Sequence, residues 1–152
     1  GEIKHYTDYS DGKLHAEWTA RITPSGRYLL DGNKTTYYPD GKTESRSTYE
    51  NGRPVVQTYW SPAGVKLWTW TYDNKNDTAV WTKYWANGNK KVVSNWLTNP
   101  ELKINQGKRK IYCKIANGLA TLFNQDGSIE ETNTFNMGCI GDAGSCLSGG
   151  WY

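Results

Sequence analysis

The sequence is poor in the residues that most often carry out chemistry. It has only two histidines, His5 and His15, together with three cysteines and one methionine. It also lacks the HExxH, GxSxG, Walker and zinc-ligand spacings that mark common catalytic and metal sites. Because the residues do not suggest any acid, base and nucleophile set, we expect a non-enzymatic protein without catalytic residues, metal or cofactor. Both histidines are expected on solvated faces of strands.

Long apolar runs are also missing. Apolar residues make up 36% of the chain, and no run approaches the roughly 20 apolar residues that cross a bilayer. We therefore expect no membrane span. The 18 basic and 15 acidic residues give a net charge of +3, which is too balanced to indicate a nucleic-acid partner. We interpret the short basic clusters Lys90-Lys91 and Lys108-Arg109-Lys110 as strand positions that discourage edge-to-edge association. The alternative is a patch for an acidic protein partner, lipid headgroups or nucleic acid.

Aromatic residues, in contrast, are abundant. The chain contains 8 tryptophans and 11 tyrosines among 152 residues. Because each large ring buries roughly 150–250 Å², we expect a thin layer of rings to do the packing that aliphatic side chains do in other proteins. A single curled sheet with one aromatic face is the simplest arrangement that meets this expectation.

One short sequence motif occurs in nearly three copies between residues 37 and 96. The segments YYPDGK, YWSPAGV and YWANGN each place an aromatic pair before a turn that ends in glycine, at Gly41, Gly64 and Gly88. These glycines follow one another at steps of 23 and 24 residues, a period typical of stacked supersecondary units. Glycine supplies the positive φ of tight hairpin turns. Each period is therefore predicted to be a β-hairpin, with intervening turns at Gly52 and over residues 73–77.

Further turn signals extend the pattern in both directions. They are Asp11-Gly12, Thr23 to Gly26 and Asp31-Gly32 before it, and Gln106-Gly107, Asn117-Gly118 and Asp126-Gly127 after it. Since strands joined by short turns pair with their sequence neighbours, we predict an all-β, single-domain antiparallel meander that forms a curled, elongated sheet over residues 1–152. Its clear repeats span residues 37–96, its divergent N-terminal repeats residues 6–36, and its divergent C-terminal hairpins and cap residues 97–152.

The strand over residues 67–72 alternates between its two faces. Trp68, Trp70 and Tyr72 point to one face, and threonines and a leucine point to the other. If Lys75-Asn76 forms a two-residue loop, the following strand folds back so that cross-strand pairs form an aromatic and basic ladder. The expected pairs are Trp70 with Trp81, Trp68 with Lys83, and Lys66 with Trp85.

The cysteines suggest an oxidising compartment. Cys139 and Cys146 lie close together in a glycine-rich segment, at a spacing that suits a small disulfide loop, and Cys113 is left over. The chain begins at Gly1 without an initiator methionine. Either a leader has been removed or Gly1 is the scar of a tag, and we expect an exported protein.

Two segments carry a resemblance to a known family. Asp40 to Trp60 (DGKTESRSTYENGRPVVQTYW) and Tyr72 to Lys91 (YDNKNDTAVWTKYWANGNKK) resemble the variant MORN repeat of the bacterial YwqK-type antitoxin family. The resemblance implies an antitoxin or immunity protein that binds a toxic protein effector, such as one delivered by type VI secretion. It also implies a periplasmic or outer-membrane-anchored location. The rival resemblance is to choline- and carbohydrate-binding repeats of cell envelopes, which cage a ligand between tryptophans.

The partner-binding residues are expected on the aromatic face, because aromatic side chains and arginine are the usual interface anchors. The same tryptophans are alternatively core residues, since the chain has few other core candidates. The predicted set is Tyr59, Trp60, Trp68, Trp70, Trp81 and Trp85, with Arg46 and Lys83 at its rim.

Overall fold

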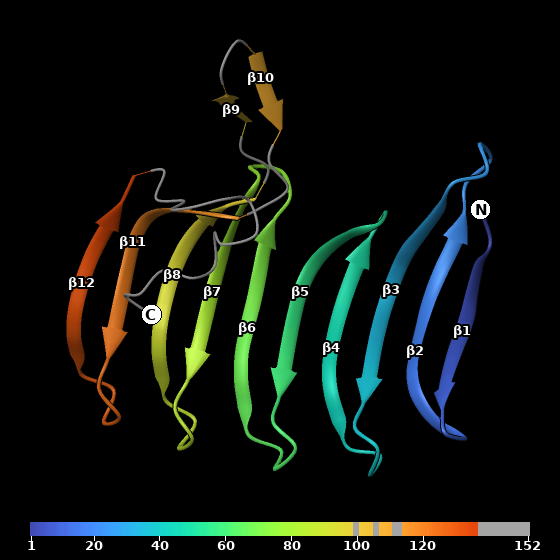
Figure 1. Ribbon diagram of the computed structural model, residues 1–152, viewed down its shortest axis with the longest axis horizontal. Coiled ribbons are helices and arrows are strands. Elements are labelled where there is room, and N and C mark those ends of the chain that lie inside the picture. The colour runs from blue at the N-terminus through green and yellow to red at the C-terminus, as the bar shows by residue number, and fades with distance from the viewer. Residues whose placement is uncertain (99–100, 105–106, 111–113, 137–152) are drawn as a thin grey trace. The chain divides into compact units, whose positions relative to one another are not determined.

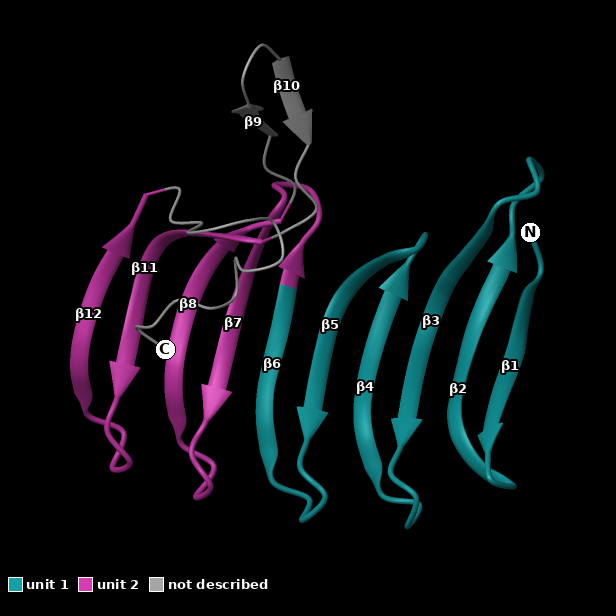
Figure 2. Cartoon of the chain, viewed as in Figure 1, with its two compact units in different colours: residues 1–71 teal, residues 72–152 magenta. Residues whose placement is uncertain are grey.

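The computed structural model describes residues 1–98, 101–104, 107–110 and 114–136. Twelve strands make up the secondary structure of these residues, which contain no helix and hence no helix that could span a membrane. The all-β prediction is therefore confirmed. The chain divides into two compact units, residues 1–71 and 72–152 (Figure 2), which are described separately. The single domain over residues 1–152 stays a prediction.

The first unit is an antiparallel meander. Its strands pair in sequence order and run side by side with bowed ribbons (Figure 1). The strands are β1 (Ile3–Ser10), β2 (Lys13–Ile22), β3 (Tyr28–Tyr37), β4 (Thr43–Glu50), β5 (Arg53–Trp60) and β6 (Lys66–Asp73), whose last two residues belong to the second unit.

The second unit continues with antiparallel pairs but interrupts the meander once. Strands β7 (Thr78–Tyr84), β8 (Lys90–Leu97), β11 (Ile115–Phe123) and β12 (Ile129–Phe135) pair in that order. Between β8 and β11, strands β9 (Glu101–Ile104) and β10 (Gly107–Lys110) form a separate antiparallel hairpin. Strand β8 therefore pairs with its sequence neighbour β7 on one side, but on the other side it pairs with β11 and not with β9, so the expectation that strands pair only with their sequence neighbours is wrong there.

Within the described parts of the chain one turn recurs five times, at residues 23–27, 38–42, 61–65, 85–89 and 124–128. In each turn the glycine amide donates to the carbonyl of the first residue, and the amide of that residue donates to the carbonyl after the glycine, over 2.8–3.0 Å. The glycine φ values lie between 84° and 91°, a region that costs other L-residues roughly 1–2 kcal/mol. This geometry confirms the predicted turns at Gly41, Gly64 and Gly88.

The predicted turns at Asp31-Gly32 and Asn117-Gly118 are wrong, because both dipeptides lie inside long strands, β3 and β11. In each case one residue of the neighbouring strand, Thr19 or Asn95, lies opposite three residues of the bulged strand, 31–33 or 117–119. Gly32 and Gly118 sit at the middle of these bulges with φ of 97° and 101°. The positive φ that suggests a turn therefore belongs to a bulge.

The loop between β6 and β7 is longer than predicted. Strand β6 ends at Asp73 and β7 begins at Thr78, so residues 74–77 form a four-residue loop, and not the two-residue loop Lys75-Asn76. The Asp73 carboxylate accepts hydrogen bonds from the Lys75 and Asn76 amides at 3.1 and 3.2 Å. The hydrogen bond from the Asn76 side chain, and then the bonds from the two amides, lower the pKa of Asp73. The face-to-face pairs predicted across this loop stay predictions.

Among the residues that the structure describes, the buried apolar ones are few and mostly small. In the first unit they are Ala16, Ala20 and Trp70, and in the second Ala79, Val92, Trp96, Ile115, Ala116 and Ala120. The expectation that large rings do most of the packing is therefore only partly right, since alanines make up much of the core. The predicted Cys139–Cys146 disulfide and the leftover Cys113 lie outside the described residues.

Candidate functional site

Strand register in the first unit places two rows of side chains on one face. Directly opposed residues share a face, and one row runs Tyr6, Trp18, Lys34, Ser47, Gln57 and Trp70 across β1 to β6. The next row on that face runs Asp8, Ala16, Thr36, Ser45, Tyr59 and Trp68. The first row has rings at both ends, and the second row has rings only at its β5–β6 end; the middle of both rows is mostly polar. We call this surface the aromatic face.

Tyr59 and Trp68 form a stacked pair on the aromatic face. Their ring centroids lie 5.2 Å apart with planes 10° from parallel, and both side chains are half-buried. Burial, and then the charge of Glu44, raise the pKa of Tyr59. Trp70, in contrast, is only 6% exposed. The alternative that the predicted tryptophans are core residues therefore holds for Trp70, whereas Trp68 remains accessible to a partner.

A second aromatic cluster lies at the β1 end of the same face. Tyr6 stacks on Trp18 with centroids 5.9 Å apart, and Tyr28 meets Tyr6 edge-on at 5.7 Å. Trp18 Nε1 donates to Tyr28 Oη over 2.6 Å, and Lys34 Nζ lies 5.5 Å from the Trp18 ring centroid. These contacts fix the rings in one arrangement.

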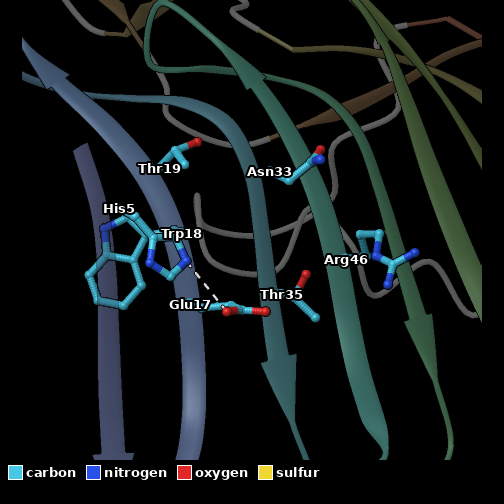
Figure 3. Close-up of a pocket in the computed structure, with 7 residues that line it drawn as sticks. All are labelled: His5, Glu17, Trp18, Thr19, Asn33, Thr35 and Arg46. Carbon is cyan, nitrogen blue, oxygen red and sulfur yellow. Dashed lines mark ion pairs between the residues drawn. The ribbon is translucent and has the colours of Figure 1, made fainter. Parts of the chain in front are cut away.

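The opposite face of the first unit is polar. Thr7, Glu17, Thr35, Arg46, Thr58 and Thr69 form one cross-strand row. A shallow depression of about 300 Å³ lies over this row, lined by His5, Glu17, Trp18, Thr19, Asn33, Thr35 and Arg46 (Figure 3). His5 Nε2 lies 3.4 Å from Glu17 Oε2. Both histidines are exposed, which confirms their expected placement.

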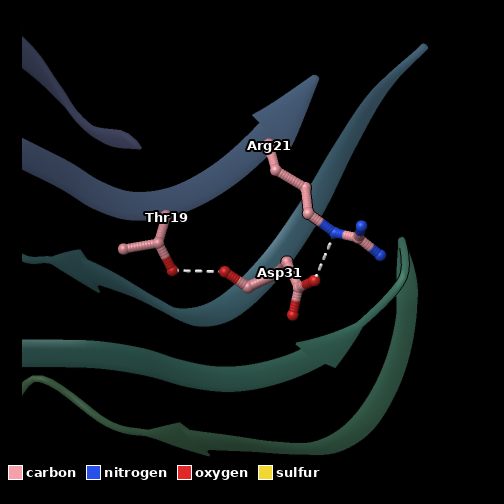
Figure 4. Close-up of polar contacts among 3 residues, drawn as sticks. All are labelled: Thr19, Arg21 and Asp31. Atoms are coloured by element: carbon pink, nitrogen blue, oxygen red, sulfur yellow. Dashed lines mark hydrogen bonds and ion pairs between the residues drawn. The ribbon is translucent and has the colours of Figure 1, made fainter. Parts of the chain in front are cut away.

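A polar cluster holds the bulge of β3 beside this depression. Arg21 Nε donates to Asp31 Oδ2 over 2.7 Å, and the Thr19 hydroxyl donates to the Asp31 carbonyl (Figure 4). A Cβ atom on Gly32 would overlap Thr19 Oγ1. The bulge of β11 is held in the same way, because Asn95 Nδ2 donates to the Leu119 carbonyl over 2.7 Å.

The structure brings the predicted partner-binding residues together only in part. Tyr59, Trp68 and Trp70 share the aromatic face, but Arg46 lies on the polar face, so it does not form a rim with them. Trp60 follows Tyr59 across a register shift and pairs with Lys66.

The remaining predicted residues lie in the second unit. Trp81 is opposite Ser94 and Lys83 opposite Val92, so both side chains share one face of that unit. Trp85 opens a turn, where its Nε1 donates to the Phe123 carbonyl over 3.1 Å and Lys91 Nζ lies 4.4 Å from its ring centroid. These two contacts tie down the Trp85 ring.

Sequence reasoning missed the polar cluster of Glu17, Tyr37 and His5. The Tyr37 hydroxyl donates to Glu17 Oε1 over 2.5 Å, although the two residues are separated by a turn and a bulge. The sequence offers no signal for this contact, since it depends on the register that the bulge creates. Among the described residues no group of three or more His, Cys, Asp or Glu side chains could hold a metal ion.

Comparison with known proteins identifies one segment. Residues 30–51 match a family model described as a MORN repeat variant, and no curated protein matches the chain. The matched residues run from the third residue of β3 through β4 to the turn before β5. This segment begins before the predicted clear repeats and covers only their first part. The chain therefore carries a repeat of the MORN variant type at residues 30–51.

Proposed function

We propose that this protein is a non-enzymatic immunity or antitoxin protein that binds a toxic protein effector through the aromatic face of its first unit. The observation that carries the proposal is the accessible, stacked pair Tyr59 and Trp68. Rings already fixed against each other lose little conformational entropy on binding, and such aromatic anchors dominate the energetics of protein interfaces.

The orientation of these rings favours a protein partner over a sugar or choline. Because Tyr59 and Trp68 lie on adjacent strands with nearly parallel rings, each ring turns one face toward the other. A sugar or a quaternary ammonium group binds against open ring faces. Ring edges beside hydroxyl groups, such as those of Thr36 and Ser45 in the same row, suit the mixed polar and apolar surface of a protein.

The repeat supports a binding role, and the resemblance to YwqK-type antitoxins supports the choice of a toxin as partner. Fold and function are not coupled tightly enough for a repeat to name its partner, so the toxin rests on the resemblance alone. The proposal includes export to the bacterial periplasm or anchoring at the outer membrane, where many secreted effectors act. It involves no cofactor and no nucleic acid.

The test is co-expression with the toxic product of a neighbouring gene. We expect the protein to restore growth, to form a stable stoichiometric complex with that product, and to pass through choline and glycan columns without retention. Elution from such a column only by free choline or sugar, together with failure to protect cells, would instead establish the envelope-binding alternative.

A further inference from the structure

The first strand of the sheet has a free edge. Strand β1 begins the strand order and pairs with β2, and among the described residues no strand pairs with its other side. A strand in this position presents unpaired amide and carbonyl groups that can template pairing with another chain. Its side chains therefore decide which chain it can accept.

The side chains of β1 are arranged for pairing. Ile3 and Tyr9 are 57% and 63% exposed, and Lys4 and Asp8 are exposed as well. Alternation places Lys4, Tyr6 and Asp8 on the aromatic face, because Tyr6 stacks on Trp18 there. The two charges thus flank one ring at equal distances along the strand. No extra residue interrupts β1, since the register shift at Asp8/Tyr9 places the additional residue, His15, on β2.

We propose that β1 is an interface for a second copy of this chain, which adds its own β1 in antiparallel register with Tyr6 opposite Tyr6. In this register Lys4 lies opposite Asp8, His5 opposite Thr7, and Ile3 opposite Tyr9, and the two-fold symmetry makes each pair twice. Opposite charges and apolar or aromatic partners directly across an antiparallel pair are the combinations that stabilise it.

The two-fold axis that relates the two copies is perpendicular to the sheet. The aromatic faces of both copies therefore lie on the same side of the combined sheet. The row that ends at Trp18 and Tyr6 then continues through Tyr6 and Trp18 of the second copy. An isologous contact of this kind closes after two copies, so the product is a dimer and not a filament. The match of charge and apolar residues of β1 with its own reverse is what favours a second copy over an unrelated strand.

Strand β12, at the other end of the strand order, provides the contrast. Its sequence IEETNTF contains Glu130 and Glu131 and no basic residue. Two such edges would bring four carboxylates together, which like-charge repulsion opposes. This edge is therefore expected to stay unpaired with itself.

Charge reversal tests the register. Sedimentation equilibrium of the wild-type chain over a concentration series is expected to show a monomer–dimer equilibrium. Lys4→Asp alone, or Asp8→Lys alone, places like charges opposite each other twice and is expected to weaken dimerisation at least about tenfold. An equimolar mixture of the two variants restores opposite charges in both pairs, so it is expected to form a heterodimer with near wild-type affinity.

The matched control is Glu130→Lys on β12, which is expected to leave the association of the wild type unchanged. Far-UV spectra and thermal unfolding of each variant establish that it is folded. A wild-type chain that stays monomeric throughout the concentration series overturns the proposal. Single reversals that dimerise like the wild type, or a mixture that fails to restore association, overturn it equally.

Discussion

Tyr37 donates its phenolic proton to Oε1 of Glu17 over 2.5 Å, between two adjacent strands of the polar face. The second carboxylate oxygen of Glu17 lies 3.4 Å from His5 Nε2, so both oxygens have partners. The hydrogen bond to Glu17 is the largest cause that raises the pKa of Tyr37 above 10.0, followed by burial and the charge of Glu17. The folded state therefore holds this proton more tightly than the unfolded chain does.

Replacing Tyr37 with Phe removes this hydrogen bond. At neutral pH we expect a loss of about 1 kcal/mol in the free energy of unfolding, because one oxygen of a half-buried carboxylate loses its donor. In the wild type the contribution is complete below pH 10.0, the unfolded pKa, and is lost as pH rises through the raised folded pKa. Urea denaturation of both proteins below and above that pH measures the difference, which is expected to shrink at high pH. A constant difference would contradict the pKa assignment.

The bulge at Gly32 gives a second prediction. Gly32→Ala places a methyl group against Thr19 Oγ1 at a φ of 97°, and we expect it to destabilise the fold by about 2–3 kcal/mol. Gly127→Ala is the matched control, since it has a similar φ of 91° and open space around the new methyl group. It is expected to cost only about 1–2 kcal/mol.

The double variant Thr19→Ala with Gly32→Ala separates the two causes of that loss. Thr19→Ala alone removes the hydrogen bond to the Asp31 carbonyl, and with Gly32→Ala it also removes the overlap. We therefore expect the double variant to lose less stability than the two single losses together, by about 1 kcal/mol. Strict additivity in thermal or urea unfolding would show that the overlap with Thr19 is unimportant.

Turns were predictable from the sequence because their chemistry is local. The pattern around Gly64 fixes a turn with five residues, two hydrogen bonds and one positive φ. The same logic predicted the hairpins at Gly12 and Gly52, which connect β1 to β2 and β4 to β5.

Register was harder to predict because bulges shift it without a distinctive local signal. Asp31-Gly32 has the composition of a hairpin turn, yet Thr19 on the neighbouring strand stabilises it as a bulge. Once the bulges are known, Arg46 falls opposite Thr58 and Thr69, away from Trp68 and Trp70. Of the predicted partner-binding residues, Tyr59, Trp68 and Trp70 therefore share the aromatic face, whereas Arg46 does not.

The recurring turn offers a stabilising substitution. Pro24, Pro39 and Pro62 occupy its second position in three copies, whereas Ala86 stands there in the turn over residues 85–89. Because that position has the φ of proline, Ala86→Pro is expected to stabilise the protein by about 0.4–1 kcal/mol. Ala63→Pro, at the third position of another copy, is the control and should destabilise, since proline there disfavours the preceding conformation. Chemical denaturation measures both, and a destabilising Ala86→Pro would contradict the common geometry.

Trp68 and Trp70 separate binding from folding on one strand. Trp70 is 6% exposed, so Trp70→Ala is expected to cost about 3–5 kcal/mol of stability. Trp68→Ala should leave a folded protein but weaken the complex with the toxic effector by about 2 kcal/mol, or about thirtyfold in Kd, as loss of a central anchor does. Arg46→Ala, exposed on the polar face, is the control and should leave the Kd unchanged. Calorimetric titration of the folded variants with the effector measures each Kd. If Arg46→Ala weakens the complex while Trp68→Ala does not, the effector binds the polar face instead.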